Sequence, residues 1–273
     1  MAKNNKDRLP LTRKEQIWYL IKNETWILFL INFFVFLFLI PVILIFFFGV
    51  STFHSYTLSA NKTNLDFFNI FLMYGLLLIP ALFILCIGFA GLMYVIKQLA
   101  FESTTKFVSF FIGIKKNFLS FFPMYLLLSI ACGMLVINFG YNLYIEGNQV
   151  LKAILIGANV LLVLTLLIAI PFYHFEACVF NNYFLAYLRN SVYLFYKAFP
   201  LSLINLLLTI LPIVLIFFIP ISVFYIPLGM LATFYISLSG LIQFIICLYT
   251  YEKIVPKDQI KEIYHKGLED VNL

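Results

Sequence analysis

The chain has 273 residues, of which 63% are hydrophobic and only 11% are charged, and its formal net charge is +6. Soluble domains contain about 25% charged residues, so this composition excludes an ordinary soluble protein. The positive charge does not indicate nucleic-acid binding, because the basic residues flank long apolar runs, where anionic lipid headgroups attract them.

Residues 1–25 precede the first apolar run. Thr12 and Glu15 have the spacing of a capping box, and apolar residues follow directly. This pattern predicts a short interfacial helix over 12–23, lying on the membrane within a cytoplasmic N-terminal segment.

Six apolar runs follow, and each is long enough to cross a hydrocarbon core of ~30 Å, which needs about 20 helical residues. Each run must be helical, because backbone polar groups find no water in the bilayer. We therefore predict an all-α polytopic membrane helix bundle with six transmembrane helices in one domain, 26–252. The predicted spans are 26–50, 68–96, 118–144, 150–175, 201–221 and 223–251.

The basic residues predict the orientation of the bundle. Sixteen of the 18 Lys and Arg residues lie in the N-terminal segment, the second and fourth connections and the tail, whereas the other connections hold only Lys62 and Lys152. Because positive charge is retained on the cytoplasmic side, both termini are predicted to be cytoplasmic, in a bacterial plasma membrane. In the tail, 253–273, Glu262 and Lys266 predict a helical turn that stops at Gly267.

The second connection, 97–117, predicts an amphipathic inner helix over 103–116. Phe107, Phe110, Phe111 and Ile114 recur at helical spacing, with lysines around them. We expect this helix to contact anionic headgroups or a protein partner. The candidate surface comprises Lys106, Phe110, Phe111, Lys115 and Lys116.

The fourth connection, 176–199, predicts a second inner helix with Leu185, Leu188, Val192 and Phe195 on one face. It also holds a polar cluster, and an ionisable group at membrane depth suggests function. One interpretation is a site in which Glu176 pairs with Arg189 or Lys197 across a turn at Asn181-Asn182; the other is a solvated helix end. The candidate residues are His174, Glu176, Asn182, Arg189 and Asn190.

Other chemistry is scarce. The four cysteines form no CxxC pair, the three histidines have no ligands at metal spacing, and no phosphate-binding Gly-x-x-x-x-Gly-Lys-[Ser/Thr] motif is present. We expect no catalytic residue, no metal and no cofactor, and thus not an enzyme. Along the last span, Thr233, Ser237, Gly240 and Gln243 share roughly one side, which indicates either close helix packing or a solute path.

One stretch, 87–118, resembles the signature region of the YesL-like family of bacterial integral membrane proteins. The pattern is carried by a small-residue span, a basic exit, an acidic residue and a Phe-Phe…Lys…Asn-Phe helix; the matching residues are Gly88, Gly91, Lys97, Glu102, Phe110, Phe111, Lys115, Asn117 and Phe118. A second stretch also fits, at Pro171, Glu176, Arg189, Asn190 and Pro200. Arg189-Asn190-Ser191 departs from the family's usual Lys-Asn-Ala. The resemblance implies a protein of no established activity, associated with uptake systems for complex carbohydrates.

Two functions remain as expectations. The first is a non-catalytic accessory protein that docks subunits of an ABC-type carbohydrate importer or anionic lipid through its inner helices. The second is a small secondary transporter, or permease-like component, for a neutral solute. An ABC permease itself is disfavoured, because the Glu176-Ala177 stretch has Asn182 where those proteins have glycine. The substrate, the partner and the oligomeric state do not follow from the sequence.

Overall fold

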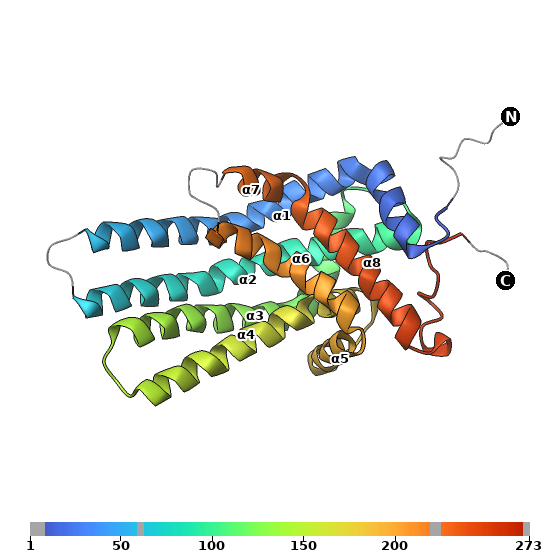
Figure 1. The fold of residues 1–273 in the computed structure, drawn as a ribbon. Coiled ribbons are helices and arrows are strands. Elements are labelled where there is room, and N and C mark those ends of the chain that lie inside the picture. The colour runs from blue at the N-terminus through green and yellow to red at the C-terminus, as the bar shows by residue number, and fades with distance from the viewer. Residues whose placement is uncertain (1–8, 59–62, 219–224, 270–273) are drawn as a thin grey trace.

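The computed structural model describes residues 9–58, 63–218 and 225–269, with side chains for all of these except 212–218 and 225–227. Within this part of the chain every regular element is helical (Figure 1). The elements are α1 (Arg13–Thr57), α2 (Asn64–Glu102), α3 (Ser109–Tyr144), α4 (Gln149–Val179), α5 (Phe184–Lys197), α6 (Phe199–Phe218), α7 (Tyr225–Met230), the π-helix η2 (Leu231–Tyr235), α8 (Ile236–Ile254) and the 3₁₀-helix η3 (Lys257–Gln259).

The described helices confirm a multi-pass membrane architecture. Five of them are long and apolar enough to cross a bilayer: α1, α2, α3, α4 and the segment Leu228–Ile254. A sixth span is present if α5 and α6, which meet at an angle of 115°, form one broken span. The predicted spans 201–221 and 223–251 extend over 219–224, which lie outside the described residues.

The start of α1 confirms the short helix that was predicted over 12–23. The Thr12 hydroxyl accepts a hydrogen bond from the Glu15 N–H at 3.2 Å, as an N-cap should. Glu24 has non-helical backbone angles, φ −117° and ψ 21°, so the residues before it form an arm set at an angle to the rest of α1 (Figure 1). The Glu15 carboxylate accepts from the Leu11 N–H, at 3.0 Å, so the cap reaches one residue further back than a capping box.

The predicted separate helix over 103–116 is wrong. Ser103, with φ 61°, ends α2, and α3 then runs unbroken from Ser109 to Tyr144. The apolar residues that predicted a lipid-facing helix are divided: Phe110 is fully buried with its ring against Gly91 of α2, Phe107 and Ile114 are half-buried, and Phe111 is exposed. The amphipathic stretch is therefore the first two turns of a long hairpin arm.

Close contact between glycines joins α2 and α3. A Cβ atom on Gly75 would lie 2.9 Å from the Gly133 carbonyl oxygen, and one on Gly133 would lie 2.7 Å from the Gly75 carbonyl oxygen. Further along, Gly140 leaves room only for Phe71, and Gly113 only for Tyr94. Small residues of this kind let two membrane helices approach until their backbones touch.

The C-terminal helices are held by polar side chains. Asn32 of α1 is fully buried; its amide nitrogen donates to the carbonyls of Leu231 and Ala232, at 2.7 and 2.8 Å, and its oxygen accepts from the Ser237 N–H at 2.9 Å. These bonds enclose η2, where the π geometry departs from the regular α-helical ladder. One side chain of α1 thus supplies partners for an irregular turn about 200 residues later in the chain.

The tail folds back on the bundle, although not as the predicted helix. After η3 the backbone forms turns as far as Gly267, which has φ +81°. Ile260 and Ile263 are buried, and the Glu269 N–H donates to the Pro10 carbonyl at 2.9 Å. The expected stop at Gly267 is present, but turns replace the helix before it.

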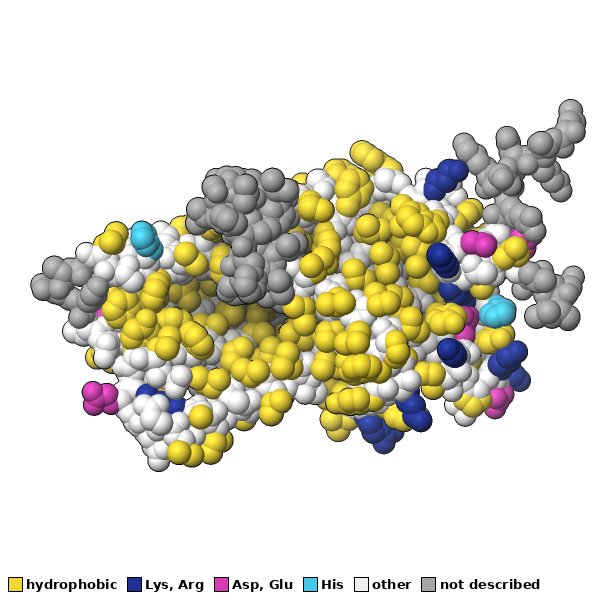
Figure 2. All heavy atoms as spheres, in the orientation of Figure 1, with side chains coloured by type: hydrophobic (Ala, Val, Ile, Leu, Met, Phe, Trp, Pro, Cys, Tyr) yellow, Lys and Arg dark blue, Asp and Glu magenta, His cyan; other side chains and the backbone are white. Residues whose placement is uncertain are grey.

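Both described ends of the chain, the α2–α3 connection and α5 lie at one end of the bundle (Figure 1). On the face drawn in Figure 2, most Lys and Arg side chains gather at this end, and hydrophobic side chains cover the rest. We call it the basic end. It comprises residues 9–25, 94–117, 176–201 and 250–269.

Candidate functional site at the basic end

Glu176 lies three residues before the end of α4 and has no exposed surface. Its carboxylate accepts a hydrogen bond from the Tyr251 hydroxyl on α8 and another from the Asn190 amide on α5, at 3.3 Å. The carboxylate therefore ties three helices together. The interpretation as a solvated helix end is wrong, since the side chain has no contact with solvent.

The predicted ion pair of Glu176 with Arg189 or Lys197 is also wrong, and the Lys197 side chain is exposed. The Arg189 side chain is exposed, and within the described residues the one ion pair joins Arg13 and Glu252 instead. The chain does turn at Asn181-Asn182, as expected, because residues 180–183 separate α4 from α5. The turn brings Asn190 to the Glu176 carboxylate and leaves its neighbour Arg189 on the outer side of α5.

The remaining predicted cluster residues separate into two places. His174 is buried, and its Nε2 lies 3.0 Å from the Tyr125 hydroxyl, while its ring stacks on Phe89 and Phe121. Two residues along a helix point to different sides, so His174 and Glu176 belong to separate contacts. Asn182 is exposed; its backbone N–H donates to the Tyr187 hydroxyl at 2.9 Å.

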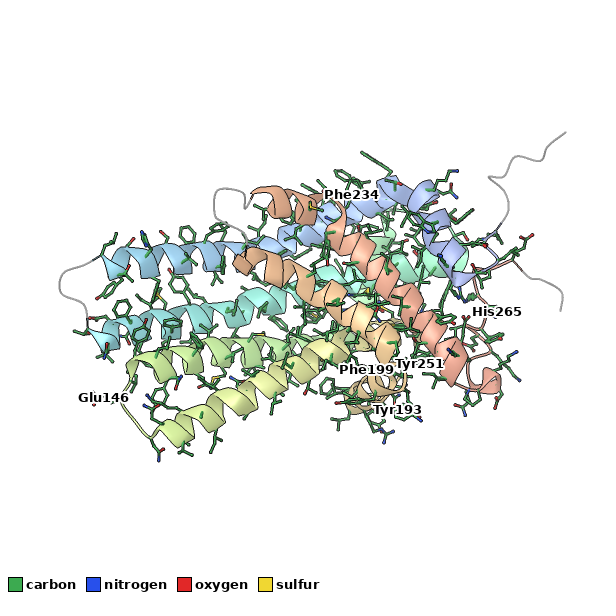
Figure 3. All side chains as sticks on the ribbon, in the orientation of Figure 1. Glu146, Tyr193, Phe199, Phe234, Tyr251 and His265 are labelled. Carbon is green, nitrogen blue, oxygen red and sulfur yellow. The ribbon has the colours of Figure 1, made fainter. Side chains whose placement is uncertain are left out.

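α5 lies at the basic end as a separate amphipathic helix, as predicted for the fourth connection. Its buried face differs from the predicted one. Phe195 is buried as expected, but Leu185 is 65% exposed, and Tyr187 and Leu194 take its place in the core. The exposed side is rich in aromatic residues, and Figure 3 shows Tyr193 and Phe199 where α5 meets α6. We call this side the α5 face: Tyr183, Leu185, Arg189, Tyr193, Tyr196 and Lys197.

The candidate lipid surface of the second connection is divided. Lys106, Lys115 and Lys116 are exposed and Phe111 is 46% exposed, whereas Phe110 belongs to the core. Lys116 contacts Tyr94, with its Nζ 3.2 Å from the tyrosine hydroxyl. Four of the five predicted residues can thus reach solvent or headgroups.

A polar network that the sequence did not indicate joins the N-terminal arm to α8 and the tail. Arg13 forms a two-point ion pair with Glu252, with nitrogen–oxygen distances of 3.1 and 2.5 Å, and donates to the Lys266 carbonyl at 2.9 Å. Gln16 donates to the Ala100 carbonyl of α2 at 2.6 Å. The charged partners lie 239 residues apart, so no local pattern could have revealed them.

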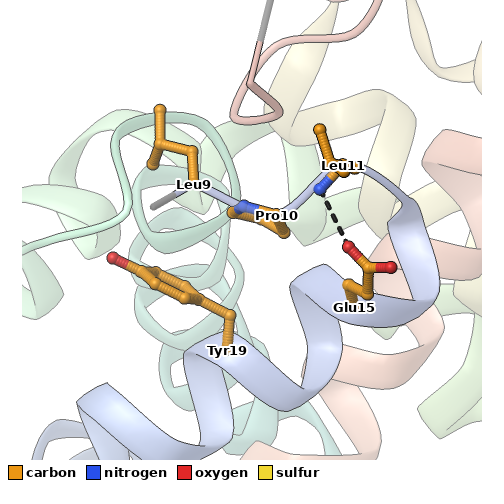
Figure 4. Close-up of a pocket in the computed structure, with 5 residues that line it drawn as sticks. All are labelled: Leu9, Pro10, Leu11, Glu15 and Tyr19. Atoms are coloured by element: carbon orange, nitrogen blue, oxygen red, sulfur yellow. Dashed lines mark hydrogen bonds between the residues drawn. The ribbon is translucent and has the colours of Figure 1, made fainter. Parts of the chain in front are cut away.

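Two hollows lie at the basic end. The first, about 250 Å³, lies between the extended residues Leu9–Leu11 and the side chains of Glu15 and Tyr19 (Figure 4). The Glu15 carboxylate in this hollow already accepts the Leu11 N–H at the start of α1. The hollow is therefore a by-product of the helix cap and not a candidate binding site. The second, about 290 Å³, is lined by side chains of α2, α3, α4 and the tail.

Three of the four residues predicted to share one side of the last span pack against neighbouring helices, whereas Thr233 is exposed and bonds carbonyls of its own span. Ser237 binds Asn32, Gly240 contacts Ile96, and the Gln243 amide donates to the Asn205 carbonyl and the Thr209 hydroxyl at 3.2 and 3.1 Å. These contacts favour the packing interpretation over a solute path. Among the described residues, no group of three His, Cys, Asp or Glu side chains is placed to hold a metal.

No protein-family model, curated protein or solved structure matches this chain. The resemblance to the YesL-like family therefore stays a prediction.

Proposed function

We propose that this chain is a non-catalytic accessory protein of a bacterial plasma membrane, with its basic end in the cytoplasm, and that it docks membrane subunits of an ABC-type carbohydrate importer. The observation that supports the proposal is the α5 face. Tyr183, Tyr193 and Tyr196 are 69, 53 and 69% exposed there, and Lys197 lies over the Tyr193 ring.

Tyrosine and arginine dominate the binding energy of protein interfaces, because they bury a large area and keep a polar group to pair. α5 is held rigidly, since Asn190 binds Glu176 and Phe195 and Leu194 lie in the core. A preformed helix presents its outer side without an entropic cost of folding on binding. The resemblance to the YesL-like family supplies the importer as the partner class.

The docking proposal is tested by affinity purification of the full chain in mild detergent from cells that express the importer. Replacing Tyr193 and Tyr196 by alanine should reduce recovery of the importer's membrane subunits by at least about tenfold, as for loss of two interface anchors. The matched control is Tyr249→Ala, which removes another exposed tyrosine at 42% exposure, from α8. Equal recovery of the importer with the double variant and with the Tyr249→Ala control would refute the docking role of α5.

The orientation is tested by labelling single cysteines with a membrane-impermeant thiol reagent. After the four native cysteines are replaced, a cysteine at Lys115 should react only in permeabilised cells, and one at Glu146, at the opposite end, should react in intact cells (Figure 3). The reverse pattern would place the basic end outside.

Glu176 favours a second candidate, a small secondary transporter for a neutral solute. Coupled carriers need a carboxylate within the membrane domain, and this one is enclosed by α4, α5 and α8. If the chain is a carrier, purified protein in liposomes should take up solute, and Glu176→Gln should abolish uptake while the protein stays folded. An accessory protein reconstituted alone should show no uptake in the same assay.

A further inference from the structure

The second hollow at the basic end gathers three lysines from three separate segments. Lys97 comes from α2, Lys116 from α3 and Lys266 from the tail, and all three line the same cavity of about 290 Å³. Lys116, Lys266 and the single lining carboxylate, Glu102, all lie within electrostatic range of Lys97. Within the described part of the chain none of these lysines forms an ion pair, and three ammonium groups against one carboxylate give the cavity a net positive charge.

Each lysine is held in place by a contact of its own. The Lys97 ammonium donates to the Cys178 carbonyl at the end of α4, at 2.6 Å. Lys116 lies over the Tyr94 ring, 5.3 Å from its centroid, and Lys266 lies over the Phe101 ring at 5.0 Å. An ammonium group has three donors, so each keeps hydrogen-bonding capacity for a ligand.

Lys266 would be a mobile tail residue without two backbone contacts. Its carbonyl accepts from Arg13, at 2.9 Å, and the next residue, Gly267, lies so close to α2 that a Cβ atom there would be 2.0 Å from the Ala100 carbonyl oxygen. With φ +81°, that position also requires glycine. The fold therefore brings the tail lysine to the mouth of the cavity.

We propose that the cavity formed by Lys97, Lys116 and Lys266 binds the phosphate group of an anionic phospholipid. A phosphate presents several oxygens to ammonium groups that converge from different sides. The buried Asn117 amide in the lining already donates to the Ala90 carbonyl and the Cys178 sulfur, so the lysines supply the donors for the phosphate. The lipid is favoured over a soluble phosphate because the cavity lies where the apolar parts of α2, α3 and α4 end. Its lining also includes the ring of Tyr94, a residue type suited to the headgroup level.

This inference rests on the proposed membrane placement of the basic end and does not depend on the partner of α5. The test uses the full chain in phosphatidylcholine vesicles with increasing phosphatidylglycerol, and measures lipid retention by native mass spectrometry and the thermal unfolding midpoint. The double variant Lys116→Gln, Lys266→Gln should weaken phosphatidylglycerol binding about 25-fold, or about fivefold per lysine. Both side chains are exposed, so the fold should persist.

The matched control, Lys115→Gln with Lys261→Gln, removes two exposed lysines from the same end but outside the cavity, and should change binding less than about threefold. Glu102→Gln, which removes the carboxylate, should tighten binding. Equal weakening by both double variants would reduce the effect to a general surface field and overturn the proposal. Stabilisation by inorganic phosphate in pure phosphatidylcholine, equal to that by phosphatidylglycerol, would overturn the lipid assignment. If the unaltered chain recovers no importer subunits while its lipid preference is intact, only the docking role of α5 is refuted.

Discussion

The α2–α3 hairpin and the C-terminal helices are held against their neighbours by different kinds of contact. The hairpin brings two backbones into contact through Gly75 and Gly133, and its polar bonds between the helices, from Lys116 and Asn117, lie near the basic end. α8 is fixed by amide side chains, Asn32 and Gln243, which bond across to neighbouring backbone groups. In lipid, apolar surface gives helices little reason to associate, so either close packing or hydrogen bonding has to do it. One chain uses both.

We expect the largest loss of stability from a substitution at Gly133, which tests the glycine contact of the hairpin. Gly133→Ile would place atoms within 2.5 Å of Ile79 and 2.7 Å of the Gly75 carbonyl, and a backbone carbonyl cannot move aside as a side chain can. Overpacking costs about 1–3 kcal/mol even in cores that adjust, so we expect a larger loss here and little folded protein. Size-exclusion chromatography and thermal unfolding in detergent measure it. Gly157→Ile is the control, because nothing lies within 4 Å of that position; similar damage from both would argue against interlocked glycines.

Asn32→Leu tests the hydrogen bonds that hold the last span against α1. It removes three hydrogen bonds and leaves two carbonyls and an N–H of the last span without their partner. We expect a loss of about 3 kcal/mol, since interhelical bonds in membranes are worth about 0.6–1.7 kcal/mol each and buried unpaired groups cost more. Unfolding in mixed micelles gives the value. Asn159→Leu should be neutral or stabilising, because the Asn159 amide nitrogen is buried without a partner among the described residues.

Glu176→Leu should cost about 2 kcal/mol, because Tyr251 and Asn190 would lose their acceptor inside the bundle. Glu176→Gln keeps an acceptor oxygen and should preserve most of the stability. Arg189→Ala should shift stability by less than about 0.5 kcal/mol, as at other exposed positions. A large effect at Arg189, measured in the same micelle assay, would restore the ion pair that the sequence predicted.

A loss smaller than that at Glu176 is expected at Gln243. Gln243→Leu removes two bonds, to the Asn205 carbonyl and the Thr209 hydroxyl, and should cost about 1 kcal/mol. Thr233→Val is the control, since the Thr233 hydroxyl is exposed and bonds only carbonyls of its own helix. If both variants have the same unfolding midpoint, Gln243 does not contribute to the attachment of α8.

The sequence predicted what depends on composition and local pattern. Long apolar runs gave the helices, Thr12 gave the start of α1, and Asn181-Asn182 gave the break before α5. It could not predict the partner of Glu176, because Tyr251 is 75 residues away and nothing local marks it. The helix over 103–116 was wrong for the same reason, as an apolar face suits lipid and a neighbouring helix equally well.

The glycines of α2 and α3 are a further signal in the sequence. Gly75, Gly133 and Gly140 interrupt otherwise bulky apolar runs, and glycine within a membrane helix is itself a sign of close packing. Their pairing across the hairpin still required the register of α2 against α3, which the sequence does not contain. The same holds for Arg13 and Glu252, whose contact depends on how the tail folds back.

The π turn at Leu231–Tyr235 has an evolutionary consequence. Such a turn contains one residue more than the corresponding α turn, and Asn32 is the side chain that makes it tolerable here. Relatives whose last span is shorter by one residue at this point would regain an ordinary helix and lose the need for an amide in α1. Among relatives, the residue at position 32 and the presence of the extra residue at the π turn, about 200 residues later, should therefore co-vary.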